Sequence, residues 1–78
     1  MPRQSREARD LIRAIVEHQQ ARHMTDGELA ALLHVSRQLW VMIRRDRTPV
    51  SLDFARKAAA HQAFREAATA VLVPEATP

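Results

Sequence analysis

The sequence has no cysteine and a single glycine among its 78 residues, and each shortage excludes a class of structure. Without cysteine no disulfide can form, and four scattered histidines are a poor set of zinc ligands. Strands need turns, and turns usually use glycine, so the composition favours helices. A single glycine also excludes a glycine-rich phosphate-binding loop. We therefore expect an all-α chain that binds no metal or cofactor.

Long apolar runs are missing as well. No apolar run, Leu39–Ile43 included, is longer than five residues, far fewer than the roughly 20 that span a bilayer. We expect a soluble protein of the cytoplasm with no membrane partner. Ser36 lies near His34, but a capping serine without a third orienting group is not an activated nucleophile, so we expect no enzyme. No small-molecule ligand is evident.

Aromatic side chains are few: Trp40, Phe54 and Phe64 are the only ones. The core must therefore be built mainly from aliphatic residues. A chain this short buries roughly 60% of the surface of its unfolded state and is only marginally stable alone. Oligomerisation is the remaining common way to stabilise so small a domain.

Positive charge is concentrated in one central stretch. The chain has 12 basic and 9 acidic residues, a net charge of +3. Residues 36–57 contain six basic residues and two acidic ones, so this stretch alone carries +4. Such a concentration attracts polyanions. The alternative is an arginine-rich helix face that is simply solvated.

Good capping residues precede four segments in which apolar residues recur at helical spacing. The predicted N-caps are Ser5, Thr25, Ser36 and Ser51. The first helix should end between residues 19 and 23, the second should run over residues 26–33, and the third over residues 37–45. Thr25 and Glu28 have the spacing of a capping box. Only three or four residues separate the second and third helices, so their connection is a tight turn.

The fourth helix is predicted to begin at Leu52, after a loop that contains Pro49. It could continue to Leu72, or break near His61 and Gln62, where the apolar stripe drifts. We expect one domain over residues 1–73 and a frayed tail over residues 74–78.

A capped short helix, a tight turn and a second capped helix are the parts of a helix-turn-helix. The apolar and capping positions that carry this pattern are Leu29, Ala30, His34, Val35, Ser36, Trp40 and Ile43. From Thr25 to about Ala59 the chain resembles the Cro/phage-repressor type of helix-turn-helix, the lambda-repressor-like DNA-binding domains. The resemblance implies an all-α domain of four to five helices, with residues 5–23 in the place of the family's first helix.

The chain departs from the family's pattern at several positions. His34 stands where the family often has a glycine in the left-handed conformation. That conformation costs a residue with a side chain roughly 1–2 kcal/mol. Trp40 replaces a smaller branched residue, and Val41 replaces a small polar one. Arg44 and Asp46 stand where many members have Glu and Gly.

The resemblance makes the third helix a recognition helix in the major groove of double-stranded DNA. Its base-contacting residues would be Ser36, Arg37, Gln38, Val41, Met42 and Arg45. Gln38 suits adenine, Arg37 suits guanine, and Val41 or Met42 can touch a thymine methyl group. Phosphate contacts would come from Thr25, Arg44, Arg47 and Thr48.

Each of these residues also has a simpler interpretation. Thr25 and Ser36 are expected to cap helices whatever else they do. Gln38 could be a solvated helix residue, Arg44 could pair with an acid such as Asp53, and Met42 could belong to a protein interface.

Apolar residues continue at helical spacing beyond the expected core. They are Phe64, Ala67, Ala68, Val71 and Leu72. We expect them to form a homodimer interface; the alternative is that this segment folds back onto the first helix.

The sequence therefore predicts a homodimeric, sequence-specific regulator, most simply a repressor of phage or bacterial origin. It would bind a palindromic operator with half-sites about 34 Å apart. The alternative is a protein-interaction module or antitoxin-like protein that binds a partner protein through Leu39, Val41 and Met42.

Overall fold

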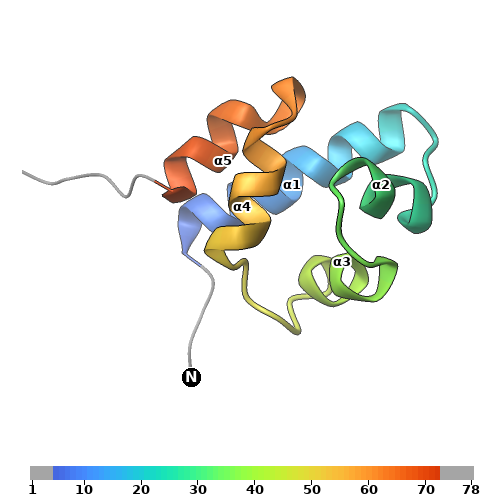
Figure 1. Ribbon diagram of the computed structural model, residues 1–78, viewed down its shortest axis with the longest axis horizontal. Helices are drawn as coiled ribbons and strands as arrows, with labels where there is room; N and C mark the ends of the chain where they lie inside the picture. The colour runs from blue at the N-terminus through green and yellow to red at the C-terminus, as the bar shows by residue number, and fades with distance from the viewer. Residues whose placement is uncertain (1–4, 73–78) are drawn as a thin grey trace, which may run out of the picture.

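The computed structural model describes residues 5–72, and this part of the chain is all-α (Figure 1). Its elements are α1 (Arg6–Ala21), α2 (Asp26–Leu32), α3 (Arg37–Arg44), α4 (Leu52–Ala59), the short 3₁₀ helix η1 (Gln62–Phe64) and α5 (Arg65–Leu72). The predicted fold class is thereby confirmed, and the described residues contain no strand. The tail expected to fray, residues 74–78, lies outside the described residues.

The four predicted caps all form, and they explain where these helices begin. The side-chain oxygens of Ser5, Ser36 and Ser51 each accept a hydrogen bond from the backbone N–H three residues later, at 3.0–3.1 Å. At α2 the capping box is complete. The Thr25 N–H donates to Glu28 Oε1 at 2.8 Å, and the Glu28 N–H donates to Thr25 Oγ1 at 3.1 Å. Each pair satisfies a backbone donor that a helix start would otherwise leave unpaired.

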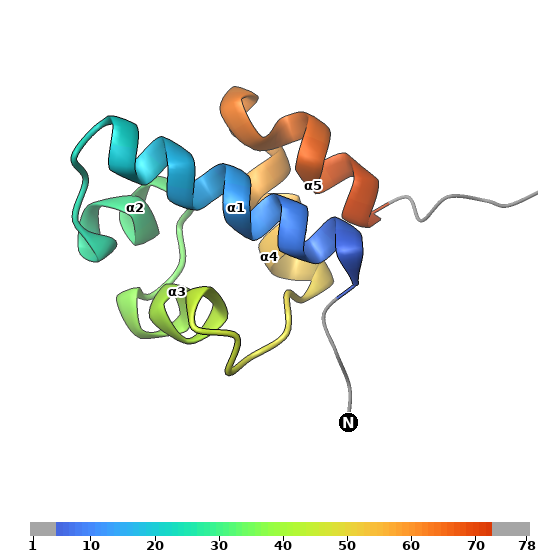
Figure 2. The same ribbon diagram turned by 180° about the vertical axis from the view of Figure 1, so that it is seen from behind.

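The helical segment after Ser51 is broken rather than continuous. His61 has extended backbone angles (φ −96°, ψ 126°), and its Nδ1 accepts a hydrogen bond from the Ala63 N–H at 3.2 Å. The chain reverses at this point, so α5 returns alongside α4 and packs against α1 as well (Figures 1 and 2). The break near His61 thus decides where the last apolar residues lie.

One hydrophobic core joins all the helices. Its largest fully buried side chains are Trp40, Phe54, Phe64, Leu11, Ile15, Leu29, Leu33 and Ile43. The rings of Trp40 and Phe54 stack almost in parallel (3°), with their centroids 6.2 Å apart. Because Trp40 and Ile43 face this core, α3 has one buried side, and its opposite side faces outward.

The assignment of Phe64 and Ala68 to a dimer surface is wrong. Phe64 is 1% exposed and Ala68 is 0% exposed within a single chain, because α5 folds back onto α1. The rings of His18 on α1 and Phe64 form a T-shaped pair, with centroids 5.0 Å apart. Ala67, Val71 and Leu72 are partly buried against the same core. Folding back onto the first helix, the alternative left open by the sequence, is what this segment does.

Candidate nucleic-acid interface

Four residues, 33–36, connect α2 to α3 and set the angle between them. His34 has the left-handed backbone expected of it (φ 59°). The turn is closed by hydrogen bonds from the His34 N–H to the Ala31 carbonyl at 3.2 Å and from the Val35 N–H to the Ala30 carbonyl at 3.0 Å. From α4, Lys57 Nζ donates to the His34 carbonyl at 3.1 Å. The predicted tight turn between the second and third helices is therefore present, and Lys57 ties it to α4.

Helix α3 lies at one edge of the molecule in both views (Figures 1 and 2). Of its predicted base-contacting residues, four are exposed: Ser36, Arg37, Gln38 and Arg45. The other two, Val41 and Met42, are partly exposed. The residues chosen from the sequence thus share one accessible face, interrupted by an apolar strip.

Arg37 lies close to the first turn of α2. A Cβ atom placed on Gly27 would be 3.9 Å from Arg37 Cδ, which is ordinary contact distance. The positive charge of Arg37 also helps to lower the pKa of Asp26, although it is the smallest of the causes. The aliphatic part of the exposed Arg37 side chain therefore lies beside the first turn of α2.

The C-cap of α3 and the loop after it each carry an arginine beside the same face, Arg45 and Arg47. Asp46 has a left-handed backbone (φ 61°), and the Arg47 N–H donates to the Met42 carbonyl at 2.8 Å, which folds the loop back onto the end of α3. Arg45 and Arg47 are exposed, and Thr48 is partly exposed. Two arginines of the positively charged stretch 36–57, Arg45 and Arg47, are thus exposed at the end of α3.

Arg44 is used differently from the expectation. Its guanidinium donates to Asp26 Oδ2 on α2 at 2.9 Å and forms an ion pair there, rather than pointing freely outward. The suggested partner Asp53 instead pairs with Lys57, at 3.4 Å. Arg44 is 31% exposed, and its Nε is buried without a hydrogen-bond partner. Its charge is therefore already neutralised within the chain.

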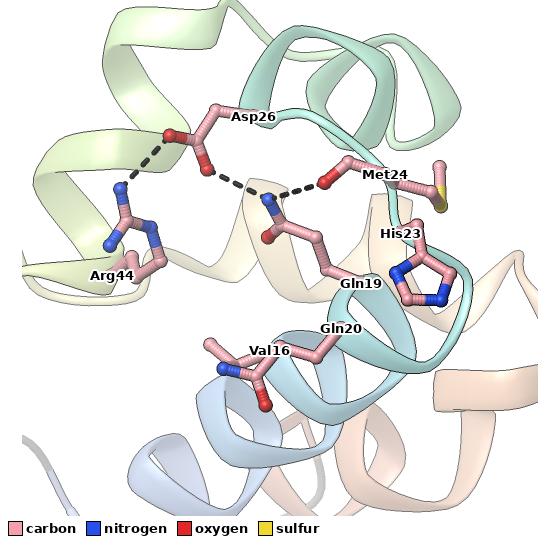
Figure 3. Close-up of a pocket in the computed structure, with 7 residues that line it drawn as sticks. All are labelled: Val16, Gln19, Gln20, His23, Met24, Asp26 and Arg44. Carbon is pink, nitrogen blue, oxygen red and sulfur yellow. Dashed lines mark hydrogen bonds and ion pairs between the residues drawn. The ribbon is translucent and has the colours of Figure 1, made fainter.

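Asp26 is joined in turn to Gln19, a residue that the helix-turn-helix pattern does not include (Figure 3). Gln19 Nε2 donates to Asp26 Oδ1 at 2.9 Å and to the Met24 carbonyl at 3.1 Å, while Gln19 Oε1 accepts from Trp40 Nε1 at 3.1 Å. The Gln19 hydrogen bond, and after it Arg44, hold the pKa of Asp26 below its ordinary value. The one signal in the sequence was that a buried tryptophan N–H needs an acceptor.

These residues border a groove between the end of α1, the start of α2 and the end of α3 (Figure 3). The groove has a volume of about 460 Å³, and its lining residues are Val16, Gln19, Gln20, His23, Met24, Asp26 and Arg44. Within residues 5–72 no three histidine or acidic side chains gather as metal ligands would, and no helix is long and apolar enough to cross a membrane.

Comparison of the chain with protein-family models, curated proteins and solved structures finds no match. The resemblance to the phage-repressor helix-turn-helix therefore stays a prediction from the residues named above.

Proposed function

We propose that the protein is a sequence-specific regulator that binds double-stranded DNA with α3 in the major groove. The observation that carries this proposal is the exposed face of α3, where Arg37, Gln38 and Arg45 stand beside Arg47. A helix that is buried on one side and presents cationic and amide side chains on its exposed side has the shape and chemistry of a recognition helix in the major groove.

Different residues would contribute affinity and specificity. Gln38 can form two hydrogen bonds with adenine, and Arg37 or Arg45 can do so with guanine. Val41 and Met42 would touch thymine methyl groups. Arg47 and Thr48 would contact phosphates and fix the register. Arg44 is left out of this set because Asp26 holds its guanidinium.

The biological setting that fits best is a homodimeric repressor of phage or bacterial origin, acting in the cytoplasm on a palindromic operator. A domain this small reads only a few base pairs, so two copies on half-sites about 34 Å apart would supply the specificity. With Phe64 and Ala68 used inside the chain, the dimer contact would have to come from Ala67, Val71 and Leu72, which are partly exposed.

The direct test is selection of bound duplexes from a randomised pool, followed by gel shift at about 150 mM salt with non-specific competitor DNA. A reproducible, symmetric consensus sequence would support the proposal. Gln38→Ala should then relax preference at one position of each half-site; equal weakening on every sequence would make Gln38 a positioning contact. Failure to select any sequence would contradict the proposal.

A second candidate function uses the apolar strip on the same helix. Leu39, Val41 and Met42 are each partly exposed, so the strip could dock a partner protein, as in an antitoxin-like protein. No retardation of DNA, together with a stoichiometric protein that co-purifies and is lost on Met42→Ser, would favour this candidate.

A further inference from the structure

We propose that Gln19, on α1, is a positioning residue that fixes the orientation of α3 for DNA binding. The inference rests on the proposed function and deepens it, because it assigns a binding role to a residue outside the helix-turn-helix. Gln19 lies in the last turn of α1 and has no place in the predicted DNA face.

The side-chain amide of Gln19 connects three helices. Its oxygen accepts from Trp40 of α3 at 3.1 Å, and its nitrogen donates to Asp26 of α2 at 2.9 Å. The second proton of the same nitrogen is positioned for the Met24 carbonyl at 3.1 Å. Every strong hydrogen-bonding atom of the amide thus has a partner, which fixes both the rotamer and the orientation of the group.

The network holds α3 at two points, one helical turn apart. Trp40 is bound by Gln19, and Arg44 is bound by Asp26 at 2.9 Å, while Gln19 itself binds Asp26. Residues four apart lie on the same face of a helix. Two anchors on that face restrict both rotation of α3 about its axis and its tilt, and these are the motions that would displace Gln38 from a base edge.

Other side chains of similar length would do only part of this. Methionine fills the same volume but leaves the Trp40 N–H and an Asp26 oxygen without their partner. Glutamate can still accept from Trp40, but it places a carboxylate against Asp26. Only an amide supplies an acceptor on one side and donors on the other.

The principal test compares Gln19→Met with Gln20→Met, which changes the neighbouring residue of the same helix and the same groove. Gln20 is exposed, so its replacement should leave DNA affinity within about twofold of the wild type. Gln19→Met should weaken binding to the selected duplex about tenfold, the loss of roughly one base contact, while binding to random-sequence duplex changes little. Both variants are measured at a temperature at which circular dichroism shows them fully folded.

A charge-conserving rescue separates positioning from general loss of stability. Gln19→Glu alone should weaken specific binding at pH 7.5 and recover as the pH falls, because a proton shared by the new carboxylate and Asp26 restores a donor. The double variant Q19E/D26N reverses the polarity of the pair and keeps the net charge of the wild type. It should recover part of the specific affinity that Gln19→Glu loses, because the new amide at position 26 can donate to the new carboxylate. Recovery stays incomplete, because the Met24 carbonyl lacks its donor and Arg44 loses its charged partner. No recovery at all would mean that the hydrogen bond between positions 19 and 26 does not position α3.

Trp40 provides a readout that does not depend on DNA. It is the only tryptophan, so the indole N–H gives one resonance. In Gln19→Met that resonance should shift and exchange faster with solvent, whereas in Gln20→Met it should not move. Wild-type affinity in Gln19→Met, or equal losses on selected and random duplexes, would overturn the inference while leaving the proposed function intact. Absence of specific binding by the wild type would overturn both.

Discussion

Three helices end at a left-handed residue that is not glycine. His23, His34 and Asp46 have φ of 54°, 59° and 61°, and each stands directly after the C-cap of α1, α2 or α3. At each end the following N–H reaches back five residues, as from Met24 to Gln19, from Val35 to Ala30 and from Arg47 to Met42. These are Schellman motifs, in which glycine is the usual left-handed residue. The chain's one glycine is elsewhere, at position 27, so each end stores backbone strain.

Replacement of His34 by glycine should therefore stabilise the protein. Relief of the left-handed strain stabilises the folded state by roughly 1–2 kcal/mol. The greater conformational entropy of glycine in the unfolded chain offsets about 0.5–1 kcal/mol of this gain. We expect the free energy of unfolding to rise by about 0.5–1 kcal/mol in urea titrations. The bond from Lys57 to the His34 carbonyl involves only the backbone at position 34 and should persist. His34→Ala is the control, and it should not be more stable than the wild type.

At the scale of the elements, what the sequence predicted well was local. Ser5, Thr25, Ser36 and Ser51 are recognisable as caps because a cap bonds a backbone N–H only a few residues away, and all four form. The left-handed turn at His34 was predictable for the same reason.

The contacts that were missed join residues distant in the chain. Gln19 and Trp40 are 21 positions apart, and Arg44 and Asp26 are 18 apart. Helical spacing shows which side of a helix is apolar but does not show which helix will cover it. This is why the spacing of Phe64 and Ala68 predicts a contact with a second copy of the chain, although both pack within a single one.

The contact between α1 and η1 contains a cluster of aromatic rings that should make it sensitive to pH. The His18 ring forms T-shaped pairs with the rings of Phe64 and His61, with centroids 5.0 and 5.5 Å apart. The rings of His61 and Phe64 stack, with centroids 4.9 Å apart. Burial, then the charges of Arg22 and His61, lower the pKa of His18 below 6.5. Neutral His18 is therefore favoured in the folded state, whereas the unfolded chain binds a proton more readily.

Stability should consequently fall as the pH drops below about 6.5, because protons then bind the unfolded chain first. The contribution of His18 is complete above that pH and is lost towards the lower pKa of the folded state. We expect His18→Phe, which keeps an aromatic ring beside Phe64, to reduce the loss of stability between about pH 7.5 and pH 5.5 in urea titrations. An unchanged pH dependence in this variant would show that other groups cause it.

At the scale of the whole molecule, α1 lies between α3 and the C-terminal elements η1 and α5. It packs against α5 and η1 on one side and against α3 on the other (Figure 2). The proposed DNA face on α3 and helix α5 therefore lie on different sides of α1, so substitutions at the two places can be tested separately.

Phe64→Leu should lower the stability of each single chain. Phe64 is 1% exposed, and a smaller side chain leaves part of its site unfilled, so a loss of about 1–1.5 kcal/mol is expected. The loss should be the same at two protein concentrations about a hundredfold apart, because the contact lies within one chain. A loss of stability that appears only at the higher protein concentration would show that Phe64 lies in a dimer interface. Thr69→Ala, an exposed change on the same helix as Ala68, is the control.

The salt dependence of DNA binding should come from the exposed arginines and not from those already paired within the chain. Arg47→Ala should reduce the slope of log affinity against log salt concentration by about 0.9, the value for one lost phosphate contact. Arg44→Ala removes the same formal charge from a neighbouring position, but its guanidinium is held by Asp26 at 2.9 Å. We therefore expect that variant to keep the wild-type slope and to lose thermal stability. Equal decreases of slope in both variants would mean that Arg44 leaves Asp26 when DNA binds, and an unchanged slope in Arg47→Ala would remove Arg47 from the phosphate contacts.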